Sequence, residues 1–160
     1  MTAYSNAVRD FVTRYSTEAG PDALLDPHAI AEWAYKRGLY KPNARTVIDA
    51  IATDIAQVFR EEYRVDRNGR RYRAKHAATE KRGTRTIALW GDMDDPNVPH
   101  SHFQKSFAQR RQQIVGDCVQ LKTDVDVYND KRQPSEPIQI PLDFTLDVEE
   151  MQLRATPKAA

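Results

Sequence analysis

The segment GDMDDPNVPHSH, residues 91–102, contains the residues best suited to metal chemistry: Asp92, Asp94, Asp95, His100 and His102. Carboxylates and imidazoles together are good ligands for divalent cations. The segment therefore admits one enzymatic hypothesis, a metal-dependent nuclease. A simpler interpretation is that the aspartates form turns before Pro96 and that the histidines begin a helix. We favour the simpler interpretation and expect no metal ligand here.

Other catalytic patterns are missing from the sequence. There is no phosphate-binding glycine loop, no nucleophile elbow and no zinc-ligand spacing. Cys118 is the only cysteine, so the chain has no internal disulfide, as is typical of a reducing compartment. We expect a non-catalytic protein that carries no cofactor.

A basic stretch, RNGRRYRAK at residues 67–75, is the strongest candidate for binding. Asn68-Gly69 between strand-forming residues is typical of a hairpin with a two-residue type I′ turn. Five of the nine residues are basic: Arg67, Arg70, Arg71, Arg73 and Lys75. In a strand, Arg71, Arg73 and Lys75 would share one side. The preference for arginine favours phosphate binding over a plain charged surface, since the guanidinium is a planar fork.

Three helices should precede this hairpin. Apolar spacing predicts helices near 3–15, 27–37 and 44–62. Asp26 and Pro27 suit the start of the second helix, and Gly38 suits the position after its end. We expect Trp33 and Ile51 to be buried where the second and third helices cross.

The order of these elements, three helices and then strands, is that of a winged helix-turn-helix, with the hairpin as the wing. In that fold the third helix enters the DNA major groove and the wing follows the phosphates. The third helix has acidic residues along its length, so we expect its N-terminal end to approach DNA. That end contains Lys41, Asn43, Arg45 and Thr46.

Residues 26–75 resemble the HARE-type winged helix-turn-helix family. The resemblance comes from an Ile-Ala pair, a Gly-Leu-Tyr end to the second helix, a threonine opening the third helix and a glycine-containing hairpin that closes on tyrosine. These are Ile30-Ala31, Gly38-Leu39-Tyr40, Thr46, Gly69 and Tyr72. The resemblance implies DNA binding or an adaptor role near DNA-acting proteins, and no catalytic residue. The chain departs from the family by a longer third helix and a third strand.

The C-terminal part is expected to serve assembly. Apolar positions from Phe107 to Tyr128 recur in alternating steps of three and four, as in a coiled-coil seam that Arg111 interrupts. This predicts a homodimer through that helix; the alternative is packing on the chain's own winged domain. Six apolar residues then alternate from Ile138 to Val148, which predicts a strand or an extended arm.

Charge is distributed unevenly although the formal net charge is only +1. Residues 60–85 contain ten basic and four acidic side chains, and residues 117–150 contain nine acidic and three basic ones. Such segregation indicates two surfaces with separate partners, or two halves that face each other within one chain or across a dimer.

The sequence has no apolar run long enough to span a bilayer and no apolar core of a signal peptide at its start. We therefore expect a cytoplasmic α+β protein without a membrane partner. It would have a winged domain at 1–95 and an assembly segment at 96–160. Its expected function is duplex DNA binding as a transcriptional regulator or accessory factor, with a protein-interaction adaptor as the alternative.

Overall fold

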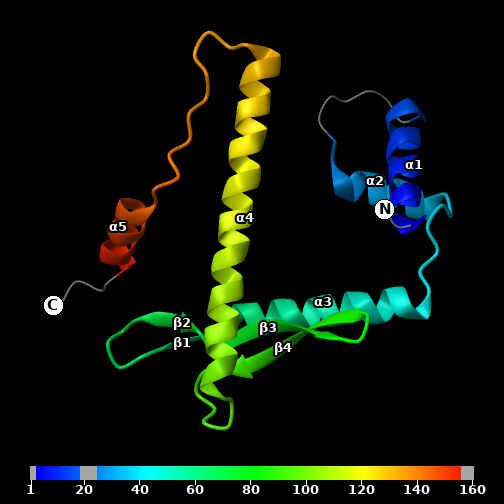
Figure 1. Ribbon diagram of the computed structural model, residues 1–160. Coiled ribbons are helices and arrows are strands. Elements are labelled where there is room, and N and C mark those ends of the chain that lie inside the picture. The colour runs from blue at the N-terminus through cyan, green and yellow to red at the C-terminus, as the bar shows by residue number, and fades with distance from the viewer. Residues whose placement is uncertain (1–2, 19–24, 156–160) are drawn as a thin grey trace. The chain divides into compact units, whose positions relative to one another are not determined.

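The computed structural model describes residues 3–18 and 25–155, and it divides the chain into two compact units, 1–53 and 54–160. The architecture is α+β, as the sequence predicts: three helices, two β-hairpins, a long helix and a C-terminal helix (Figure 1). Both hairpins belong to the same unit as the long helix.

The first unit contains α1 (Ala3–Glu18) and α2 (Pro27–Lys36). The predicted start of α2 is confirmed, since the Asp26 carboxylate accepts a hydrogen bond from the His28 amide at 2.9 Å. The predicted end is confirmed as well, with Gly38 at φ +66°. Trp33 of α2 is half-buried and meets the Tyr15 ring edge-on, with centroids 5.6 Å apart.

Helix α3 (Ala44–Glu61) begins where the sequence predicts, because Asn43 Oδ1 accepts a hydrogen bond from the Thr46 amide at 2.9 Å. Its apolar face is not buried. Val47, Ile48 and Ile51 are 49%, 63% and 52% exposed. The expectation that Ile51 is buried against the second helix was therefore wrong, since an apolar stripe shows which side of a helix seeks contact but not which surface supplies it.

The first hairpin pairs β1 (Tyr63–Val65) with β2 (Arg71–Arg73), but its turn differs from the expected type I′. Gly69 has φ +77°, whereas Asn68 is not in the positive-φ region. The Asp66 carboxylate explains the difference. It accepts hydrogen bonds from the backbone amides of Asn68 at 2.9 Å and Arg70 at 2.8 Å, which holds a longer turn with one left-handed residue.

The second hairpin pairs β3 (Lys75–Arg82) with β4 (Arg85–Asp92). The sequence suggests one continuous strand from Arg70 to Thr79, but the chain changes partner at the fully buried Ala74. The Ala74 amide donates to Glu62 O at 2.9 Å, and Ala74 O accepts from the Met93 amide at 2.8 Å. Ala74 therefore joins two separate two-stranded sheets.

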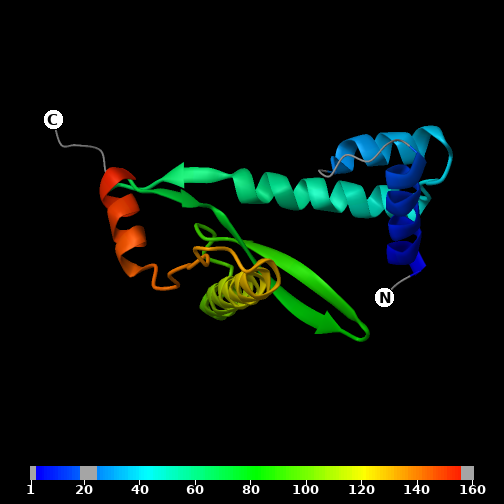
Figure 2. The same cartoon turned by 90° about the horizontal axis from the view of Figure 1, so that it is seen from above.

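Helix α4 (His100–Arg132) packs through its first turns on β3. Polar side chains at helical spacing bind the backbone of that strand. His102 Nε2 lies 2.8 Å from His76 O, Ser106 donates to Ala77 O, and the Gln109 amide bonds both Thr79 N and Thr79 O. Figure 2, viewed nearly along the axis of α4, shows the β3–β4 hairpin passing beside the helix.

The arm, residues 133–144, has no regular secondary structure and runs back along α4 (Figure 1). The prediction of a strand or an extended arm from Ile138 to Val148 was wrong for its last residues, because residues 145–155 form α5 (Thr145–Ala155). The Asp143 carboxylate accepts a hydrogen bond from the Thr145 amide at 3.1 Å and caps that helix. Among the described helices, none combines the length and apolar character needed to cross a bilayer.

Candidate nucleic-acid interface

The two faces of the β1–β2 hairpin differ in charge. Tyr63 pairs with Arg73, Arg64 with Tyr72, and Val65 with Arg71. Directly paired residues point to the same face of an antiparallel sheet, and neighbours along a strand point to opposite faces. Arg71 and Arg73 therefore share one side with Tyr63, as the alternation predicts. We call this side the arginine face.

Tyr63 holds both arginines of the arginine face. The Arg71 guanidinium carbon lies 3.9 Å from the centroid of the tyrosine ring, and Arg73 Nε donates a hydrogen bond to the phenol oxygen at 3.2 Å. The pKa of Tyr63 is lowered, chiefly by that hydrogen bond from Arg73 and also by the charges of Arg71 and Arg110. Stacking on an aromatic ring orients a guanidinium while leaving its in-plane N–H groups available to an acceptor.

A shallow cleft of about 430 Å³ lies beside this face. Helix α4 contributes Arg110 and Phe107 to it, so side chains distant in sequence meet there. Three arginines line the cleft, and no described carboxylate does. The lining residues are Tyr63, Arg71, Tyr72, Arg73, His76, Met93, Phe107 and Arg110. Burial lowers the pKa of His76, and nearby Arg110 adds to this effect. An anion entering the cleft would meet uncompensated positive charge.

On the opposite face of the hairpin, carboxylates neutralise the arginine. Arg64 Nη2 lies 2.7 Å from Asp92 Oδ2 and 2.8 Å from Glu62 Oε1, and its Nη1 lies 2.6 Å from Asp94 Oδ2. Arg64 holds the pKa of Asp92 down to about 2, while the three carboxylates raise the pKa of Arg64. Tyr72 also donates to Asp94, at 2.8 Å. Sequence reasoning missed Arg64 and Arg110, because neither has a local signal and both depend on long-range contacts.

The remaining predicted wing residues have separate environments. Arg67 is exposed in the turn and forms no ion pair with a described residue. Arg70 is paired with Asp66, with Nη2 and Oδ2 2.7 Å apart. Lys75 was expected to share a side with Arg71 and Arg73, but it is a quarter exposed, is ion-paired with Glu62 and lies over the Phe59 ring. The bend at Ala74 redirects it, because Lys75 begins the second sheet.

The four helix-end candidates lie in the first unit. Lys41, Asn43 and Arg45 are exposed, and Thr46 is half-buried beside its cap, Asn43. Arg45 is 3.8 Å from Asp49, with both side chains largely exposed. These residues surround the N-terminal end of α3, which has the favourable partial charge for an anion.

The aspartates and histidines of residues 91–102 do not form one cluster of metal ligands. Asp92 and Asp94 bind Arg64, Asp95 accepts a turn hydrogen bond from the Asn97 amide, and His102 reaches back to β3. Within residues 3–18 and 25–155, no group of three or more His, Cys, Asp or Glu side chains lies close enough to hold a metal ion.

Comparisons of the chain with protein-family models, with curated proteins and with solved structures find no match.

Proposed function

We propose that the protein binds duplex DNA without catalysis, and that the arginine face of the β1–β2 hairpin grips the phosphate backbone. The observation that carries this proposal is the cleft lined by Arg71, Arg73 and Arg110 with no described carboxylate. Phosphate contacts supply most of the affinity of such interfaces, and arginine suits them because its fork can bind two phosphate oxygens at once.

The contrast between the two faces of the hairpin supports this choice over a merely solvated surface. Arg64 is surrounded by three carboxylates, whereas Arg71 and Arg73 are held by a neutral tyrosine. A tyrosine orients the guanidinium groups without cancelling their charge. That arrangement favours an anionic partner on the arginine face.

A winged helix-turn-helix of the HARE type is the finer form of the proposal. It requires α1, α2 and the start of α3 to share one core, with α3 presenting Arg45 and Thr46 to the major groove. The exposed Val47, Ile48 and Ile51 are the side chains that such a core would bury. A regulator or an accessory factor of DNA transactions would use this arrangement.

The test measures duplex affinity by fluorescence anisotropy across a series of salt concentrations. Arg71→Gln with Arg73→Gln should weaken binding to unrelated duplexes by a similar factor, on the order of tenfold or about 1.4 kcal/mol. The slope of log affinity against log salt should become shallower by roughly 1.8, about 0.9 for each phosphate that the variant no longer neutralises.

The matched control is Arg82→Gln with Arg85→Gln, which removes the same charge from the exposed tip of the β3–β4 hairpin. It should leave the slope near that of the wild type, apart from a small general charge effect. Equal losses in both double variants, or no duplex binding at low salt, would reject the arginine face as a DNA grip. Loss for one sequence only would instead indicate base recognition.

A protein-interaction adaptor is the second candidate, favoured by the exposed apolar face of α3. Ile55 and Val58, 49% and 63% exposed, extend that face toward the C-terminal end of the helix. Contiguous apolar surface of this kind is typical of protein contacts. An adaptor would show no steep salt dependence toward DNA.

A further inference from the structure

Most of α4 has no sheet beneath it. The side chains of α4 that bond β3 or line the cleft beside the arginine face lie between His102 and Arg110, whereas residues 111–132 share a cleft with the arm and bond it through Asn129. Those 22 residues correspond to about 33 Å of helix. Isolated helices are marginally stable in water, and Gly116 lowers helix propensity further. This segment needs a further packing partner.

The surface offered to that partner is an apolar seam. Phe107, Ile114, Leu121 and Tyr128 recur every seven residues and are 46%, 52%, 40% and 43% exposed. Their pattern is symmetric along the helix. Phe107 and Tyr128 are equally far from the midpoint between Asp117 and Cys118, and so are Ile114 and Leu121. A second α4 running in the opposite direction would therefore present the same apolar positions.

Charge along α4 indicates the identity and direction of the partner. From His100 to Gly116 the helix contains Lys105, Arg110 and Arg111 and no carboxylate. From Asp117 to Asp130 it contains four aspartates and one lysine. Two parallel copies would place like charges side by side, whereas two antiparallel copies would place each basic half along an acidic half.

We propose that α4 pairs with α4 of a second copy of this chain, antiparallel, with the two-fold axis near residues 116–118. Arg111 of each copy then lies near Asp124 of the other. The interface is isologous, as expected for a C2 dimer. This inference does not depend on the proposed DNA binding.

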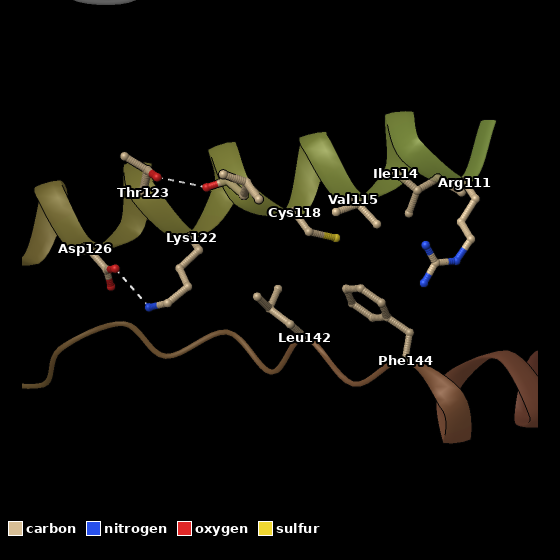
Figure 3. A pocket seen from close by; sticks show the side chains of 10 residues that line it. Arg111, Ile114, Val115, Cys118, Lys122, Thr123, Asp126, Leu142 and Phe144 are labelled. Carbon is tan, nitrogen blue, oxygen red and sulfur yellow. Dashed lines mark hydrogen bonds and ion pairs between the residues drawn. The ribbon is translucent and has the colours of Figure 1, made fainter. Parts of the chain in front are cut away.

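The arm would flank the pair rather than replace it. Leu142 and Phe144 approach α4 beside Cys118 and Val115, and a cleft of about 580 Å³ separates the arm from the helix (Figure 3). The side-chain amide of Asn129 ties the arm to the helix, bonding both Ile138 N and Ile138 O at 2.9 Å. Cys118 and Val125 on the seam remain only half-buried, so the arm leaves apolar seam surface for the second helix.

Two charge variants test the proposal by sedimentation velocity. One is Arg111→Glu, and the other is Asp124→Lys. We expect the wild type to dimerise at tens of micromolar, roughly the range of weak dimers. Each variant alone should dimerise at least tenfold more weakly, since antiparallel pairing would oppose like charges. An equimolar mixture should recover dimers, because position 111 of each chain then opposes the opposite charge at position 124 of the other.

Direction is read independently by disulfide trapping in a Cys118→Ser background, with diamide as the oxidant that accepts the two thiol hydrogens. When the Ile114→Cys variant is mixed with the Leu121→Cys variant, antiparallel pairing should form a disulfide between the two different variants. Parallel pairing would instead link each variant to a second copy of itself. Circular dichroism confirms that the variants are folded. A monomeric wild type, self-linked disulfides, or single variants that dimerise as tightly as the wild type would each overturn the proposal.

Discussion

At the scale of single residues, the feature that was hardest to predict is that the arginines on the two faces of the first hairpin have different partners. Arg64 binds Asp92, Asp94 and Glu62 and ties the first hairpin to the end of β4. Arg71 and Arg73 lean on Tyr63 instead. Both faces of the hairpin contain arginine. Whether the charge of an arginine is neutralised depends on the neighbouring side chains, which are carboxylates around Arg64 and a tyrosine beside Arg71 and Arg73.

The low pKa of Asp92 predicts how the stability of the fold changes with pH. In the folded protein the pKa of Asp92 is about 2, below its usual value of 3.8. The charged carboxylate therefore stabilises the fold in full at pH values above 3.8. That contribution is lost as pH falls from about 4 towards 2. Asp92→Asn lacks it at every pH, so its melting temperature should fall less than that of the wild type over this range.

Thermal denaturation followed by circular dichroism between pH 5 and 2 measures the effect. Glu149→Gln is the control, since Glu149 is exposed and forms no ion pair with a described residue. The control should follow the wild type. Parallel curves for Asp92→Asn and the wild type would show that the ion pair with Arg64 does not support stability.

At the scale of elements, the packing of α4 on the second hairpin depends on small residues. Ala74, Ala78 and Ser106 are buried, so helix and strand approach closely. Gly91 of β4 lies in a crowded place. A Cβ there would lie 2.7 Å from Val98 Cγ1 and 2.9 Å from His102 Cδ2. The His102 ring cannot move freely, because it is bonded to His76 O.

Gly91→Ala should therefore destabilise the second unit by about 1–3 kcal/mol, the usual cost of overpacking. Urea denaturation measures it. Gly116→Ala is the matched control. A Cβ at position 116 meets nothing within 4 Å, and replacing a helical glycine should stabilise the helix by about 1 kcal/mol. A neutral Gly91→Ala would mean that the start of α4 can shift away from β4.

At the scale of the whole molecule, the antiparallel pairing of α4 has a consequence for DNA binding that rests on both proposals. The β1–β2 hairpin and the N-terminal turns of α4 share the basic cleft. A helix of 33 residues is about 50 Å long. Two antiparallel helices would then place the two arginine faces near opposite ends of the pair, where they could hold separate stretches of duplex.

We therefore expect the protein to link two duplexes. Bead-bound DNA should retain a labelled second duplex when the wild type is present. Arg111→Glu should lose this bridging, and a longer probe duplex should not restore it. If the protein binds the bead-bound DNA but does not retain the second duplex, the proposal of DNA binding stands and the proposal of an antiparallel dimer fails.

Local signals in the sequence determined the helix starts and the turns. Asp26, Asn43, Gly38 and Gly69 act on backbone groups a few residues away, so their effects do not depend on distant contacts. The arginine alternation of β2 is equally local, because successive side chains of any strand point to opposite faces. The basic hairpin was predictable for this reason, and the long helix was predictable from the alternating steps of three and four between its apolar residues.

Only the tertiary structure decided what those elements meet. The alternating residues 145–148 read as a strand, yet without a partner strand, and with Asp143 as a cap, they form a helix. Lys75 faces Glu62 because the chain changes sheets at Ala74. Arg110 reaches the hairpin because α4 packs on β3. Burial, charge pairing and strand partners depend on residues distant in sequence, and no local pattern encodes them.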